Sequence, residues 1–345
     1  MDEKAFGDAV LGFQEELKKA YSSSPPSSGV KIYPEPFFMH PTSVRDYQVT
    51  FCDGGNYPLI VTHFYALEVN RVFLSTWRGA KRLAYASIDF FSMTRQAGGY
   101  VSSVVWPLSF TVKGYGLGAG DLEPIVRMDE ENTLVRYREL GGLEALLKAA
   151  QIPRRIGERR LMAAAMAAGS GFFVFDGLLQ AEVPQESSAI QKAVSLSEER
   201  GLMVAGFAKT AGLLDPGTLP KSIFTRTGEW YARIGETETR DSYIYAVRFH
   251  RSSLTPYVVE VSKRGAGDYD SFFRALFSDS LDPHLPGYPH GLLDADRHAR
   301  VRRHEAERLR ARFISKLPVE QAQEILRQER AITTHEALNL ISSWR

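Results

Sequence analysis

Hydrophobic residues follow two different periods along this chain, and the change between them separates a strand-rich first part from a mixed second part. Between about residues 47 and 112, apolar residues form short runs divided by turn residues, which predicts a meander of β-strands. From about residue 129 the leucine spacing becomes helical and continues through an Ala/Met-rich stretch to Ala168. The predicted strands are 49–51, 58–63, 69–74, 83–89 and 101–112.

The second part alternates strands with helices. Gly169-Ser170-Gly171 ends the Ala/Met-rich helix, and an apolar strand begins at once at Phe172. Strands first, and then strands alternating with helices, predict an α/β fold with a mixed sheet and helices packed on it. The further predicted elements are a helix at 189–200, a strand at 202–207, a hairpin of 243–249 with 257–261, a helical region at 292–313 and a short helical tail after Pro318.

The N-terminal part is set apart by a low-complexity stretch. Apolar residues spaced three and four apart from Phe6 to Leu17 predict an amphipathic helix over about residues 3–20. The Ser/Pro-rich run from Ser22 to Gly29 predicts a flexible linker. The helix either binds a partner or a second copy, or packs on its own domain. The predicted divisions are helix and linker at 1–29, a main domain at 30–316 and a helical tail at 317–345.

Composition and charge restrict the class of protein. The 345 residues are 44% hydrophobic and 24% charged, which is typical of a globular protein with a sizeable core. The single cysteine, Cys52, excludes an intramolecular disulfide and a Cys-based zinc site, and it suits a reducing cytoplasm. The N-terminal residues show neither a signal peptide nor a membrane span, so we expect a soluble cytoplasmic protein that does not bind a membrane.

The net charge of +1 means that any nucleic-acid surface must come from local clustering. Such a cluster lies between residues 297 and 312, where seven arginines stand against two glutamates. Arg297, Arg300 and Arg303 could line a nucleic-acid channel. The alternative is a solvated helix face on which the glutamates are local partners.

Two apolar runs stop at an Asp-Gly step, one at Asp53-Gly54 and the other at Asp176-Gly177. A carboxylate at a strand end is held rigidly, and a glycine directly after it lets the backbone turn away so that a metal ion can approach. Asp-Gly is also a strong turn signal, and each copy alone is more typical of a hairpin or a strand exit.

Additional acids could complete a metal site. Magnesium and manganese prefer oxygen ligands, and a two-metal site needs three or four carboxylates from separate elements. Asp53 and Asp176 could supply two, Glu158 on the preceding helix a third, and Asp296 at the start of the basic helical region a fourth.

Each of these further acids has a structural alternative. Glu158 could be a solvated helical residue paired with Arg154 or Arg155. Asp296 could be a first-turn acid that interacts favourably with the helix dipole.

Three other features are weaker evidence for a functional site. Lys209 follows a strand as the two aspartates do, and could either hold a phosphate as a point charge or be an ordinary surface lysine. The Gly-rich run 114–120 is followed by no Lys-Ser/Thr pair and no clear helix, which favours a mobile loop over a phosphate-binding loop. Cys52 would face away from Asp53 on the strand, as expected of a buried structural thiol.

In their order and spacing, these motifs resemble the NurA nuclease family over about residues 45 to 313. The resemblance rests on Asp53-Gly54-Gly55 after an apolar strand, the helical Glu158, Phe-Val-Phe-Asp176-Gly177-Leu-Leu, Gly206-Phe-Ala-Lys209-Thr210, and the late element Gly287-Tyr-Pro-His290 to Asp296. It implies an RNase H-like core, DNA as substrate, manganese or magnesium as cofactor with two ions, a homodimer, and a HerA-type hexameric translocase as partner in DNA-end resection.

The resemblance also assigns roles. Asp53 and Asp176 match the core metal-binding acids, Glu158 the helical acid and Asp296 the last metal position. Some relatives carry His at that last position, which makes His290 a second candidate. The first motif reads Asp-Gly-Gly here, where Asp-Gly-Ser is usual.

These assignments predict a metal-dependent DNA exonuclease acting 5′ to 3′, with single-strand endonuclease activity, in which Lys209 and the arginines offset phosphate charge. One alternative is a non-catalytic DNA-binding or HerA-docking subunit. Another is a nucleotide-using enzyme built on the Gly-rich run.

Overall fold

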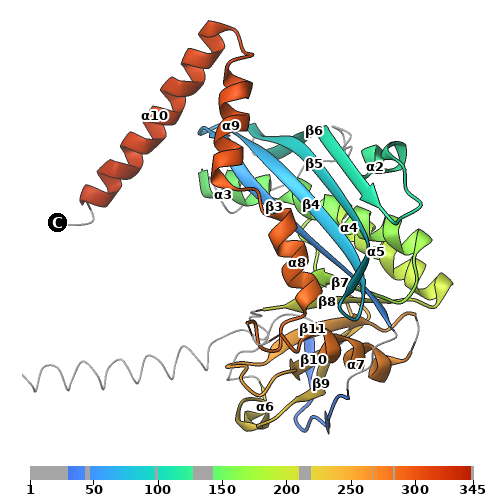
Figure 1. Cartoon of the computed structure of the whole chain (residues 1–345). Coiled ribbons are helices and arrows are strands. Elements are labelled where there is room, and N and C mark those ends of the chain that lie inside the picture. The colour runs from blue at the N-terminus through green and yellow to red at the C-terminus, as the bar shows by residue number, and fades with distance from the viewer. Residues whose placement is uncertain are drawn as a thin grey trace, which may run out of the picture. The chain divides into compact units, whose positions relative to one another are not determined.

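The computed structural model describes residues 30–42, 47–97, 100–126, 143–209, 219–265, 267–282 and 284–342 (Figure 1). The predicted N-terminal helix and its linker lie outside these residues. The chain divides into two compact units. What we call the meander unit comprises Asp46–Phe173, Gln180–Leu202 and Gly291–Arg345. The hairpin unit comprises Val174–Leu179, Met203–His290 and the described residues before 46. The predicted divisions at residues 29 and 316 stay predictions.

Four long antiparallel strands form the sheet of the meander unit, which confirms the predicted meander. Consecutive strands pair with each other, and Asp53 stands opposite Phe73, which in turn stands opposite Ser87. The strands are longer than the sequence indicated, and predicted strands 49–51 and 58–63 are one strand with an irregularity between Pro58 and Ile60. The four are β3 (Gln48–Val61), β4 (Tyr65–Arg78), β5 (Lys81–Ala97) and β6 (Tyr100–Lys113).

The prediction that the first apolar run stops at Asp53-Gly54 is wrong, because β3 continues straight through both residues. The two glycines allow neighbouring helices to pack closely against the strand at this point. A Cβ on Gly54 would lie 2.2 Å from Oε1 of Glu158, and a Cβ on Gly55 would lie 2.4 Å from the carbonyl oxygen of Ala299. Neither distance leaves room for a side chain, so the strand stays extended and narrow instead of turning.

The second Asp-Gly step behaves as predicted. Strand β7 (Phe172–Asp176) ends at Asp176, and Gly177 turns the backbone with a φ of +92°. Residues with a Cβ rarely adopt this conformation, so the glycine is needed for the turn.

Helices cover the meander sheet on both faces (Figure 1). On one face lie α8 (His290–Ala299) and α9 (Arg303–Ile314), and on the other α4 (Ile152–Ala168) packs on the sheet with α5 (Pro184–Arg200) packed on α4. Side chains alternate along a strand, so Phe51, Asp53 and Gly55 face α8, whereas Cys52 and Gly54 face α4. The contacts agree: a Cβ on Gly291 would meet the Phe51 ring, and one on Gly157 would meet Val72.

The predicted helical region 292–313 is two helices, with a break at residues 300–302. An ion-pair group holds the second of them to the sheet. The guanidinium of Arg71 on β4 donates to Asp89 of β5 at 2.7 Å and to Glu305 of α9 at 2.6 Å. The predicted tail is present as α10 (Val319–Ser342), and α3 (Leu143–Ala150) packs beside β4 and β5.

The Gly-rich run leads directly into a helix, α2 (Ala119–Val126), so the expectation that no helix opens there is wrong. Asp121 in its first turn accepts a hydrogen bond from the backbone N–H of Gly118 at 2.8 Å. This side-chain contact satisfies a donor at the start of the helix. The carboxylate of Asp121 therefore already accepts the hydrogen bond that this N–H group would donate to a bound phosphate.

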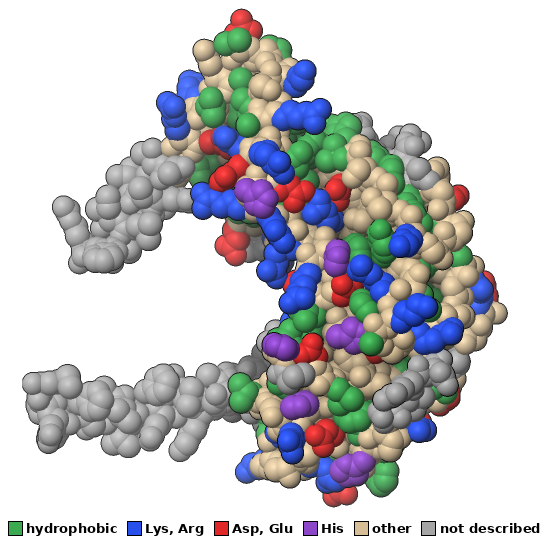
Figure 2. Space-filling view, in the orientation of Figure 1, with side chains coloured by type: hydrophobic (Ala, Val, Ile, Leu, Met, Phe, Trp, Pro, Cys, Tyr) green, Lys and Arg blue, Asp and Glu red, His purple; other side chains and the backbone are tan. Residues whose placement is uncertain are grey.

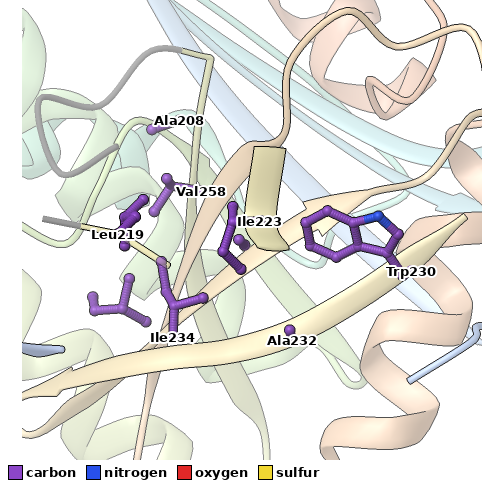
Figure 3. Packing of buried hydrophobic residues seen from close by; sticks show 9 residues of the cluster. Ala208, Leu219, Ile223, Trp230, Ala232, Ile234 and Val258 are labelled. Carbon is purple, nitrogen blue, oxygen red and sulfur yellow. The ribbon is translucent and has the colours of Figure 1, made fainter. Parts of the chain in front are cut away.

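The hairpin unit is built on antiparallel strands in the order β1-β9-β10-β11-β8. The predicted hairpin is confirmed as β10 paired with β11. A core of fully apolar residues, with Trp230, Ile223 and Val258 among them, packs against these strands (Figure 3). The strands are β1 (Val30–Ile32), β2 (Phe38–Met39), β8 (Met203–Ala208), β9 (Trp230–Thr237), β10 (Ser242–Arg248) and β11 (Tyr257–Ser262), and the helices are α6 (Lys221–Thr225) and α7 (Tyr269–Asp279).

Strand β7 belongs to both units, since Phe172 and Phe173 count with the meander unit and its last three residues with the hairpin unit. In the meander unit, the ring of Tyr47, just before β3, stacks on Phe172 at 5.3 Å. In the hairpin unit, the N–H of Gly177 donates to the carbonyl oxygen of Phe207 on β8 at 2.8 Å. These arrangements confirm a mixed sheet flanked by helices, and the RNase H-like classification stays a prediction.

The close contact of Gly55 with Ala299 generates a stability prediction. Gly55→Ala forces a methyl group against a backbone oxygen, so we expect it to lower the free energy of unfolding by about 1–3 kcal/mol. Gly116→Ala is the control, since a Cβ there meets nothing within 4 Å and should change stability by no more than about 0.5 kcal/mol. Urea denaturation measures both; equal midpoints for the two variants would contradict the packing role.

Candidate metal centre and nucleic-acid surface

Asp53 lies in the middle of β3, on the face covered by α8. Its residue surface is only 8% exposed, and Oδ1 accepts a hydrogen bond from the N–H of Gly54 at 2.7 Å. The residue opposite it, Phe73, packs against Ala295 and Ala299 of α8. Asp53 is thus a buried acid held beside a helix that arrives from the far end of the sequence.

Glu158 approaches the same strand from the α4 face. It is 4% exposed, and one guanidinium nitrogen of Arg154 both binds its carboxylate and donates to the carbonyl oxygen of Gly54 at 2.9 Å. The interpretation of Glu158 as a solvated residue is wrong, because α4 turns this side chain toward the sheet. The pairing with Arg154 is confirmed.

Asp296 lies in the second half of α8, since the helix begins at His290. Its interpretation as a first-turn acid is therefore wrong. Its carboxylate binds Arg300 one turn later at 2.7 Å and is about a third exposed. The neighbouring His298 stacks on Phe73 at 4.6 Å, so this part of α8 lies along the segment of sheet that contains Asp53.

In the hairpin unit, Asp176 and Lys209 come together from the ends of β7 and β8. Nζ of Lys209 lies 3.2 Å from Oδ2 of Asp176 and 4.8 Å from the centre of the Tyr288 ring. The lysine is half exposed, which leaves its ammonium accessible to an anion. The strand-end placement predicted for this pair is what brings the two residues together.

His290 contacts a buried acid that sequence reasoning missed. Nδ1 of His290 lies 3.1 Å from the carbonyl oxygen and 3.6 Å from Oδ1 of Asp279, at the end of α7. Burial raises the pKa of Asp279 to about 8. Helix α7 was not predicted, so only its Asp-containing apolar pattern, Phe272-Phe273 to Phe277-Ser-Asp279, could have indicated this acid.

A second missed acid is Glu68 on β4. Its residue surface is 3% exposed, and Asn56 donates to Oε2 at 2.9 Å. Burial raises the pKa of Glu68 to about 7, while the Asn56 hydrogen bond and the charge of Arg154 act in the opposite direction. The sequence feature that could have indicated Glu68 is a single acid within an apolar strand, at a position that faces α4.

Cys52 is buried and faces α4, with its thiol 3.7 Å from the carbonyl oxygen of Glu158. Burial raises the pKa of this thiol well above its usual value, which disfavours the nucleophilic thiolate. The interpretation as a buried structural thiol is confirmed.

The predicted metal-site residues divide between the units. The meander unit contains Asp53, Glu158 and Asp296, and the hairpin unit contains Asp176, Lys209 and His290. Their carboxylate oxygens suit a hard divalent cation in chemistry. In the described part of the chain, however, no three His, Cys, Asp or Glu side chains are gathered so that they could hold a metal ion. The complete ligand set stays a prediction.

Arginines of α8, of the break that follows it and of α9 form an exposed basic surface, visible along these helices in Figure 2. Arg297, Arg300 and Arg303 are all exposed. Arg300 binds Asp296 and Arg303 binds Glu307, each at 2.7 Å and one helical turn apart. Such exposed pairs are weak and exchange readily with other anions. In the same described residues, every helix is too short or too polar to cross a membrane.

Comparison of structures finds a likeness to the crystal structure of the NurA nuclease from Sulfolobus solfataricus. It covers 92% of this chain and 98% of that one, with a TM-score of 0.45 and 12% sequence identity. A second likeness, to the crystal structure of A. aeolicus Argonaute, covers 76% of this chain and 29% of that one, with a TM-score of 0.32 and 11% identity. No family model and no curated protein matches the sequence.

The raised pKa of Glu68 generates a prediction on stability and pH. The folded protein holds this proton more firmly than the unfolded chain, so the contribution of Glu68 is lost as pH rises from about 4.5 through about 7. We expect Glu68→Gln to gain stability over the unsubstituted protein across this range, reaching roughly 3 kcal/mol above pH 7.

Urea denaturation at several pH values measures this difference. Glu324→Gln is the control: hydrogen bonds from Arg327 and Gln328 lower the pKa of that exposed carboxylate, so no gain with rising pH is expected. A stability difference for Glu68→Gln that does not change with pH would contradict the burial effect.

Proposed function

We propose that this protein is a metal-dependent DNA nuclease. The observation that carries the proposal is the burial of two carboxylates, Asp53 and Glu158, around one narrow segment of β3 at Gly54. Buried acids are costly unless they are paired or bind a cation. The two acids reach this segment from opposite faces of the sheet, Asp53 from the face covered by α8 and Glu158 from the face covered by α4. The missing side chains at Gly54 and Gly55 keep both acids close to the strand backbone.

We assign the metal ligands to Asp53, Glu158, Asp176 and Asp296, with His290 as the alternative to Asp296. The bound ions, manganese or magnesium and two in number, would supply an activated water and stabilise the leaving oxygen. Lys209 exchanges its contact with Asp176 for a substrate phosphate, which it binds as a point charge. Arg297, Arg300 and Arg303 bind the DNA backbone.

The finer assignments rest on the motif resemblance. They are 5′-to-3′ exonuclease and single-strand endonuclease activity, a homodimer, a cytoplasmic location, and work with a HerA-type hexameric translocase in DNA-end resection.

A second candidate is a non-catalytic DNA-binding or translocase-docking subunit. One arrangement favours it: Arg154 and Arg300 bind two of the proposed ligand carboxylates, as in a protein whose acids are structural. Calorimetric titration separates the two functions, because a docking subunit shows no manganese binding that depends on Asp53.

The nuclease proposal predicts loss of activity from two single substitutions. Asp53→Asn and Asp176→Asn each remove a charge from the proposed metal site, so manganese-dependent cleavage of labelled DNA should fall at least about a hundredfold. Asp294→Asn is the matched control on α8, since Asp294 binds Arg82 at 3.0 Å and has no assigned role with metal. Undiminished cleavage by either test variant refutes the metal-site assignment.

The basic surface predicts a salt effect. Each of Arg297→Gln, Arg300→Gln and Arg303→Gln should reduce the slope of log affinity against log salt concentration by about one, since each removes one phosphate contact. Fluorescence anisotropy with DNA in EDTA measures the slope without cleavage. Arg327→Gln is the control, because that arginine binds Glu324 within α10 and has no assigned contact with DNA. An unchanged slope in all three variants would mean that these three arginines make no contact with DNA phosphates.

A further inference from the structure

Arg154 occupies the position of a cation beside Glu158. Its guanidinium binds the Glu158 carboxylate and the carbonyl oxygen of Gly54, two oxygen ligands of the kind that a hard metal ion takes. The Glu158 side chain is buried and that of Arg154 is mostly enclosed, with 5% and 16% exposed, respectively. The positive charge of Arg154 therefore neutralises Glu158 within the protein itself.

A second buried acid shares this arginine. Glu68 on β4 is held by Asn56, and the charge of Arg154 acts on it as well. The Nε atom of Arg154 is buried without a hydrogen-bond partner among the described residues, which makes its present position incompletely satisfied. Arg154 thus contacts the carboxylate of Glu158 and acts electrostatically on Glu68, so a move toward Glu68 would keep its charge beside an acid.

We propose that Arg154 is the built-in counter-ion of Glu158, displaced toward Glu68 when a divalent cation binds at Glu158. The inference rests on the proposed function, since it concerns binding of the nuclease metal. Arg154 is then a positioning residue that sets metal affinity.

Competition for one carboxylate has a measurable consequence. A cation that must displace Arg154 binds more weakly than it would at a Glu158 without the arginine. Removal of the arginine leaves Glu158 buried and uncompensated, which destabilises the metal-free protein. Metal binding then restores the lost compensation, so affinity and metal-free stability should change in opposite directions.

The test is Arg154→Met, which removes the charge and keeps an unbranched side chain that can fill most of the space of the arginine stem. In calorimetric titration with Mn²⁺, we expect the variant to bind about tenfold more tightly than the unsubstituted protein. In EDTA its Tm should be lower, and Mn²⁺ should raise that Tm by more than it raises the Tm of the unsubstituted protein. Arg155→Met is the matched control, since the adjacent arginine binds Glu182 and Glu186, and should leave Mn²⁺ affinity unchanged.

Glu68→Gln tests the second half of the proposal, and does so even if Arg154→Met fails to fold. Without the second acid, Arg154 stays on Glu158, so Mn²⁺ affinity at pH 8 should fall severalfold. An unchanged affinity contradicts the movement toward Glu68.

The outcomes distinguish this inference from the proposed function. If Arg154→Met and the unsubstituted protein bind Mn²⁺ equally, or the variant binds more weakly, the displacement is overturned and the nuclease proposal stands. If neither protein binds Mn²⁺, both are overturned.

Discussion

The structure depends on the absence of side chains from β3 at Gly54 and Gly55. A carboxylate from α4 lies against one glycine, and a backbone carbonyl at the end of α8 lies against the other, at distances that exclude even a methyl group. Two helices can therefore press on opposite faces of one strand at the same point. Asp53 directly precedes this point, so the packing that brings the helices together also buries the acid and fixes its position.

Ion pairs compensate most of the proposed ligand acids. Three of the proposed ligand acids each hold a cationic side chain: Glu158 holds Arg154, Asp296 holds Arg300 and Asp176 holds Lys209. The pairs differ in exposure. Arg300 and Lys209 reach solvent and can exchange a carboxylate for a phosphate at little cost, whereas the Arg154 pair is enclosed. Under the proposed function, the same kind of contact would serve DNA binding at two positions and control of metal binding at the third.

The sequence predicted those parts of the fold that local pattern determines. The meander and the β10–β11 hairpin follow from apolar runs between turn residues, and the turn after Asp176 follows from a glycine with positive φ. Asp53-Gly54 is the same pair of residues, but here Gly54 and Gly55 make room for residues about a hundred or more positions away. No local sequence pattern shows such a contact. Glu68 and Asp279 were missed for a similar reason, since their burial is set by α4 and by the unpredicted α7.

The segments that cover the Asp53 face of the sheet, α8 and α9, follow the meander strands far along the sequence. Arg71 on β4 binds Glu305 on α9, 234 residues later, and the residue that closes over Gly55 is Ala299. During synthesis the meander can form from neighbouring strands long before α8 exists, leaving an open sheet face. A chain that stops short of α8 lacks both Asp296 and the cover over Asp53. Any activity that needs these residues therefore requires synthesis to continue through α8, and a chain that stops earlier leaves the apolar residues of this sheet face exposed.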